Sequence, residues 1–175
     1  MKPNSAAAVR EAIATVQKLT LEIPALESTA ADNLKSLSTL EADGYLEDKV
    51  VIDEIVRRQA FAALFPRRIE ARQSTLILAE QSLKESVDGF ISGELRERVT
   101  EIAKSVRAKV RSALKFAFTD NRALDHAVEE SELVQQLRGV EWAVGIESSP
   151  ANVIAYANRK LDALVAAEEL AKRAA

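Results

Sequence analysis

Residues 94–118, ELRERVTEIAKSVRAKVRSALKFAF, decide the fold class of this chain. Leu95, Val99, Ile102 and Val106 follow one another at steps of three and four residues, which place them on one face of an α-helix. Charged side chains fill the remaining faces, so the stretch predicts a long amphipathic helix. Strong helix formers also dominate the rest of the chain, and stretches of alternating β-branched and aromatic residues are missing. We therefore predict an all-α fold.

Proline and glycine residues divide the remainder of the chain into further helical segments. We expect Pro24 to end a first helix, Pro66 to kink or break a later one, and Asp43-Gly44 to form a turn. Residues 1–43 would then form an N-terminal helical hairpin. The expected helices span residues 5–23, 24–42, 45–88 with the kink or break at Pro66, 94–118, 121–138 and 150–172.

The segment Gly89 to Gly93, GFISG, separates two of these helices and predicts a tight reversal. The flanking segments 67–88 and 94–115 each hold 22 residues, and equal lengths suit antiparallel packing. We therefore expect one domain, residues 1–175, built as a helical bundle. Its centre would be a long antiparallel coiled-coil-like hairpin at about residues 46–118, in which a kinked helix meets its antiparallel partner, with flanking helices before it and at 120–175.

The composition removes most catalytic and metal-binding chemistry. The 175 residues include no Cys and one His, so zinc sites, thiol catalysis and histidine-rich metal clusters lack their ligands. The Glu-x-x-His pair of di-iron bundles is missing as well, because Ala123 stands three residues before His126. We interpret His126 as an ordinary surface residue. We predict no enzyme activity, catalytic residue, cofactor, metal ion or small-molecule substrate.

Charge is distributed unevenly along the chain. Residues 1–56 carry a net charge of −5, residues 57–115 carry +6 and residues 116–175 carry −4. If the chain reverses at Gly89 to Gly93, the basic ends of the two central helices lie together and need an anionic or acidic partner. The candidate contacts for that partner are Arg57, Arg58, Arg67, Arg68, Arg72, Lys104, Arg107, Arg111 and Lys115.

Two kinds of partner fit this basic end. One is acidic protein, either the flanks of the chain itself or a neighbouring subunit. The other is an external polyanion, whose phosphates Lys and Arg bind with release of counterions. We favour the acidic protein, because the net charge of the chain is −3 and no DNA-reading motif is present.

Trp142 is the only Trp, and it lies in a short apolar run between Gly139 and Gly145. Large aromatic side chains anchor both cores and interfaces. Trp142 is therefore either a core residue, which we favour, or a docking anchor for a partner. The same two interpretations hold, with the core again favoured for most, for Phe61, Phe65, Phe116 and Phe118.

These features favour a non-enzymatic helical interaction or scaffold protein. Its apolar side chains outside the main stripes, such as Val50, Ile77 and Leu78, need cover and predict a homo-oligomer or a complex with another protein. The alternative is a nucleic-acid-associated protein that grips phosphates without reading sequence. Structural proteins of phages and mobile elements are often small, helical and free of Cys, which makes them one setting.

No membrane association is expected. Arg10 and Glu11 interrupt the apolar start of the chain, so a secretory signal is not predicted. The longest uncharged run has 11 residues, fewer than the roughly 20 that a membrane helix needs. We therefore predict a cytoplasmic protein.

Overall fold

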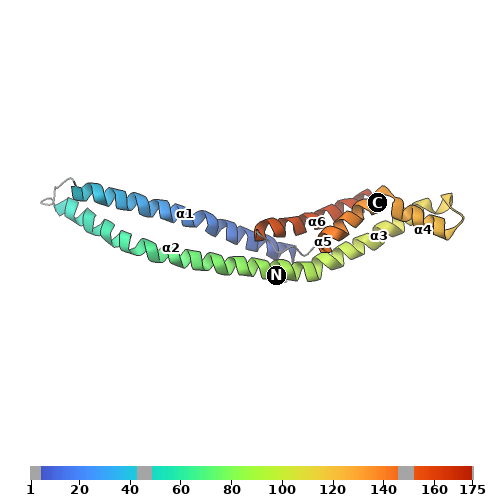
Figure 1. The fold of residues 1–175 in the computed structure, drawn as a ribbon, viewed down its shortest axis with the longest axis horizontal. Helices are drawn as coiled ribbons and strands as arrows, with labels where there is room; N and C mark the ends of the chain where they lie inside the picture. The colour runs from blue at the N-terminus through green and yellow to red at the C-terminus, as the bar shows by residue number, and fades with distance from the viewer. Residues whose placement is uncertain (1–4, 43–48, 146–151, 175) are drawn as a thin grey trace. The chain divides into compact units, whose positions relative to one another are not determined.

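A computed structural model describes residues 5–42, 49–145 and 152–174. These residues form helices joined by short turns, and they contain no strand, which confirms the all-α prediction. The predicted turn at Asp43-Gly44 and the predicted start of the last helix at Ser149-Pro150 lie outside the described residues. In chain order the elements are α1 (Ala6–Ala42), α2 (Lys49–Phe90), η1 (Ile91–Leu95), α3 (Arg96–Leu114), η2 (Lys115–Ala117), α4 (Asn121–Glu130), α5 (Glu132–Gly145) and α6 (Val153–Arg173) (Figure 1).

The chain divides into two compact units. We call residues 14–82 the hairpin unit, and residues 1–13 with 83–175 the bundle unit. The division crosses α1 and α2, so each of these helices contributes to both units.

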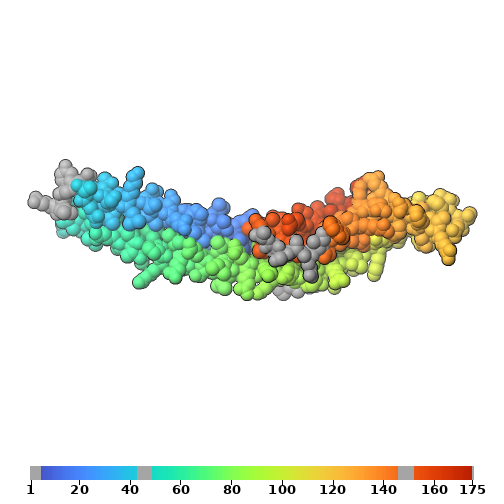
Figure 2. Space-filling model, viewed as in Figure 1, coloured from blue at the N-terminus to red at the C-terminus, as the bar shows by residue number. Residues whose placement is uncertain are grey.

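The hairpin unit consists of the parts of α1 and α2 that lie within residues 14–82, packed antiparallel, and Figure 2 shows these parts in contact. The Asn33 side-chain amide donates a hydrogen bond of 3.0 Å to the backbone carbonyl of Arg58, and Gln59 donates one of 3.2 Å to Glu41. The side chains turned inward recur at alternating steps of three and four residues, except that α2 has one step of seven, from Ile69 to Leu76, because Arg72 between them is exposed. On α1 they are Val16, Leu19, Ile23, Leu26, Ala30, Asn33, Leu37 and Leu40, and on α2 they are Val51, Ile55, Arg58, Ala62, Phe65, Ile69, Leu76 and Ala79.

The prolines do not end their helices, so the predicted N-terminal hairpin of residues 1–43 is wrong. Pro24 lies inside α1 and Pro66 inside α2, and both are exposed. A proline removes one backbone donor, but the carbonyl left without that donor can be satisfied by water or by local adjustment on an exposed face. The stripe continues past each proline without a change of step, so packing keeps the helix intact. Segments 5–23 and 24–42 are one helix, and the partner of this helix is α2.

The bundle unit packs α4, α5 and α6 around α3. One buried cluster joins Ala103 and Val106 of α3 to Leu137 of α5 and Leu170 of α6, and a second joins Leu124, Val128 and Val134 across α4 and α5. Side-chain caps define two of the helix starts. The Asp120 carboxylate accepts from the backbone N–H groups of residues 122 and 123 at the start of α4, and Asn152 accepts from that of residue 155 in α6. The predicted helix 121–138 is divided at Ser131, and the apolar run around Gly139 belongs to α5.

The predicted reversal at Gly89 to Gly93 is also wrong. The chain passes from α2 through the π-helical turn η1 into α3, as Figure 1 shows, with non-helical backbone angles at Gly93 (φ −108°, ψ −105°). Phe90 and Leu95 flank this kink, and both are fully buried. A tight reversal would expose Phe90 or Leu95, whereas a bend keeps both side chains buried. The segments 67–88 and 94–115 therefore do not form an antiparallel hairpin, and α3 packs instead against α4, α5 and α6.

Replacing Pro24 or Pro66 by alanine is expected to raise the free energy of unfolding by about 1 to 3 kcal/mol, because the variant restores a backbone N–H inside a continuous helix. Urea unfolding followed by circular dichroism measures this change. The control Gln17→Ala, at an exposed position of α1, should alter stability little. A less stable proline variant would contradict this account.

Candidate interaction surfaces

The five basic candidates of the hairpin unit differ in whether they meet a carboxylate. Arg57 and Arg58 share Glu54, with Nε to carboxylate oxygen distances of 3.1 and 2.7 Å. Arg72 on α2 reaches Glu22 on α1 at 3.6 Å. Arg67 and Arg68 are exposed, and neither forms an ion pair with any described residue. Only these two arginines of the hairpin unit therefore present a charge that the described part of the chain leaves unpaired.

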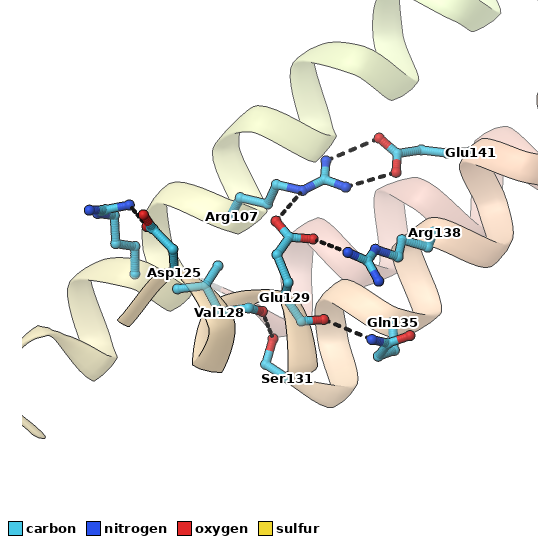
Figure 3. Close-up of polar contacts among 9 residues, drawn as sticks. Arg107, Asp125, Val128, Glu129, Ser131, Gln135, Arg138 and Glu141 are labelled. Carbon is cyan, nitrogen blue, oxygen red and sulfur yellow. Dashed lines mark hydrogen bonds and ion pairs between the residues drawn. The ribbon is translucent and has the colours of Figure 1, made fainter. Parts of the chain in front are cut away.

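The basic candidates of the bundle unit include the best-satisfied arginine of the molecule. The Arg107 guanidinium donates two hydrogen bonds of 3.0 and 2.9 Å to the Glu141 carboxylate, and its Nε lies 3.3 Å from Glu129. Arg138 also binds Glu129, at 2.7 Å, so the network joins α3, α4 and α5 (Figure 3). The hydrogen bonds to Glu141, together with the nearby negative charges, raise the pKa of Arg107 although burial opposes the change. Arg107 thus has its charge satisfied inside the protein.

The remaining basic candidates lie on or just after α3. Arg111 is paired with Asp125 of α4. Lys104 and Lys115 are exposed and have no ion pair with a described residue. These side chains belong to the bundle unit and the five arginines of α2 to the hairpin unit, and no turn at Gly89 to Gly93 folds α3 back on α2.

Trp142 is 72% exposed, so our favoured interpretation of it as a core residue is wrong. It lies on the outer side of α5, and the space around the Cα atoms of Gly139 and Gly145 is open. Its role as a docking anchor stays a prediction. Among the phenylalanines, Phe65 is buried and Phe118 is half-buried, whereas Phe61 and Phe116 are exposed, Phe116 to 96%.

Exposed apolar side chains gather in the hairpin unit. Its described residues include six buried hydrophobic side chains but nine large hydrophobic side chains that are exposed. In the described residues of the bundle unit the corresponding numbers are twenty-one and three, so the hairpin unit exposes a much larger share of its large hydrophobic side chains. The nine exposed side chains are Leu21, Leu34, Val50, Ile52, Val56, Phe61, Leu64, Ile77 and Leu78.

Sequence reasoning missed Lys160, which is the one buried charged side chain among the described residues and is 3% exposed. Its Nζ donates to the carbonyls of Ala143 and Val144 at 2.8 and 3.1 Å, and it lies 5.2 Å from the centre of the Tyr156 ring. Both carbonyls belong to the last turn of α5, where the helix dipole is negative. Lys160 therefore fastens α6 to the end of α5. Its place within the apolar stripe of α6 is the signal that could have revealed it.

Neither the metal-binding side chains of the described residues nor comparison with known proteins indicates a further site. Within the described residues no group of three or more His, Asp or Glu side chains is placed to hold a metal ion, and His126 is exposed on α4. None of the helices in the described ranges is long and apolar enough to cross a membrane. Comparisons with protein-family models, curated proteins and solved structures found no match for this chain.

The substitution Lys160→Met is expected to lower the free energy of unfolding by about 1 to 3 kcal/mol, because two carbonyls at the end of α5 lose a buried donor. Thermal unfolding followed by circular dichroism measures the loss. Lys172→Met removes an exposed lysine from the same helix and is the matched control, with an expected effect within about 0.5 kcal/mol. Equal effects of the two substitutions would show that Lys160 does not hold α5 and α6 together.

Proposed function

We propose that this chain is a non-enzymatic helical interaction or scaffold protein that self-associates through its hairpin unit. The observation that carries the proposal is the set of nine large exposed hydrophobic side chains on two helices. Monomeric soluble proteins rarely expose contiguous apolar patches larger than a few hundred Å². The nine side chains are concentrated in one unit, so we propose that another protein covers part of them, and a second copy of the chain is the partner that is always available.

The energetics of the hairpin unit support self-association. Each Val, Leu or Ile side chain moved from water into an apolar contact contributes about 1.5 to 3 kcal/mol. Two helices alone have one shared face, so their outward apolar side chains cannot be covered by each other. Burial of a few of these side chains between copies offsets the loss of translational and rotational freedom on association.

The alternative of a phosphate-gripping protein receives less support. Five of the nine basic candidates form ion pairs with carboxylates of the chain, and Arg107 forms them with two. A polyanion would have to displace these carboxylates before binding the arginines. We therefore retain the scaffold proposal, in the cytoplasmic setting that the sequence predicts.

Analytical ultracentrifugation of the full chain tests the proposal. We expect a mass at least twice the 19.1 kDa of one chain, increasing with protein concentration. The double variant Ile77→Asp with Leu78→Asp should shift the protein to the monomer, because it places two charges where we propose that two exposed apolar side chains are covered.

The matched control is Val165→Asp, which introduces a charge at an exposed apolar position of the bundle unit and should leave the mass unchanged. A wild-type chain that sediments as a monomer up to its solubility limit would refute the proposed function.

A further inference from the structure

The outward side of α2 carries a second row of side chains with helical spacing. From residue 56 to residue 81 its members follow one another at alternating steps of four and three residues, and all of them are exposed. At 3.6 residues per turn this row lies about 150° around the helix from the inward stripe. We call it the outer row: Val56, Ala60, Ala63, Arg67, Glu70, Ser74, Ile77 and Gln81.

The composition of the outer row suits close packing of another helix. Ala60, Ala63 and Ser74 are small, so they let a second backbone approach. Leu64 and Leu78, exposed to 49% and 67%, border the row on one side and would be covered by such a helix. Alternating steps of four and three residues are the spacing that lets one helix follow another over several turns.

The charges of the outer row identify the partner. Arg67 and Glu70 stand at equal distances from the point between Arg68 and Ile69, and neither forms an ion pair with a described residue. We propose that a second copy of this chain packs its α2 antiparallel on the outer row, with the two-fold axis passing between Arg68 and Ile69. This inference rests on the proposed self-association and specifies its geometry. Arg67 of each copy then meets Glu70 of the other, and the interface uses one pairing twice.

The other positions of the outer row agree with this register. Across the same axis Ala63 meets Ser74, Ala60 meets Ile77, and Val56 meets Gln81. Each of these pairs contains at least one small or apolar side chain, and none contains a charged one. Opposite charges also pair toward the two ends of α2. Across the same axis Lys49 meets Asp88 and Asp53 meets Lys84, because the two residues of each pair stand at equal distances from it.

Other arrangements of two α2 helices are less favourable. A parallel pair in register would place Arg67 against Arg67 and Glu70 against Glu70, and such like-charge contacts are destabilising. An antiparallel pair shifted by seven residues would set Arg67 against Ala63 or Ile77, which leaves its charge without a partner. Only the register centred between Arg68 and Ile69 pairs both charges.

Cysteine cross-linking tests the geometry directly, because the chain contains no Cys of its own. The double variant Ala63→Cys with Ser74→Cys is expected to form covalent dimers under mild oxidation. Within one chain the two positions are eleven residues apart on one helix, about 16 Å, which is too far for an internal disulfide. The matched control Ala63→Cys alone should stay unlinked, since in the proposed dimer its two copies are also about 16 Å apart.

Charge exchange supplies a second readout. Arg67→Glu or Glu70→Arg alone should raise the dissociation constant of the dimer at least about tenfold, because each creates two like-charge contacts. The combination of both substitutions should restore association, and circular dichroism of each variant checks that the helices are intact.

The results separate this inference from the proposed function. Covalent dimers of the double cysteine variant, with rescue by the double charge exchange, support the antiparallel register. The register is overturned if Ala63→Cys alone cross-links to the same extent, or if the charge exchanges do not change the dissociation constant of the oligomer. Either result leaves self-association standing. A chain that is a monomer in ultracentrifugation removes both.

Discussion

The apolar stripe buried between α1 and α2 is the constraint on which the rest of the hairpin unit depends. Each large aliphatic side chain in it contributes about 1.5 to 3 kcal/mol when fully buried, so a few such side chains outweigh the roughly 3 kcal/mol that one proline costs a helix. Both helices consequently run through their prolines. With only two helices in the unit, every side chain that points away from the stripe faces outward, and the exposed surface is set by the same geometry that forms the core.

The sequence predicted the class of fold and the break between residues 118 and 121, but it placed breaks at Pro24 and at Gly89 to Gly93 that the chain does not make. The segment 94–117 is helical as its spacing indicates, from the end of η1 through α3 to η2, and Phe118 is extended. Pro24 and the GFISG segment are local signals, and each was interpreted as a break. In the structure longer-range burial overrides both: residues on either side of Pro24 share one stripe, and Phe90 and Leu95 are buried on either side of Gly93. Local propensity does not contain that information.

The candidate surfaces were predictable to a different degree. Val50, Ile77 and Leu78 were identified because they fall outside the stripes, and they are exposed. Trp142 was misjudged because bulk and hydrophobicity alone do not say which side of a helix faces the core. The expected common basic end of the charged candidates depended on a reversal that the chain does not make, whereas pairing with acidic residues of the chain itself was among the expected outcomes and is formed by Arg58, Arg107 and Arg111. Lys160 could have been found, since it interrupts a row of otherwise apolar or aromatic residues on α6.

The hydrogen bond from Asn33 to the main-chain carbonyl of Arg58 has a consequence for which substitutions α1 and α2 can accept. An amide within an apolar stripe is tolerated where it finds an acceptor, and leaving it without one costs about 1 to 3 kcal/mol. The acceptor is backbone, so substitution of the Arg58 side chain leaves it in place. This contact between the two helices thus depends on the identity of residue 33 alone, because every amino acid at position 58 would supply the acceptor.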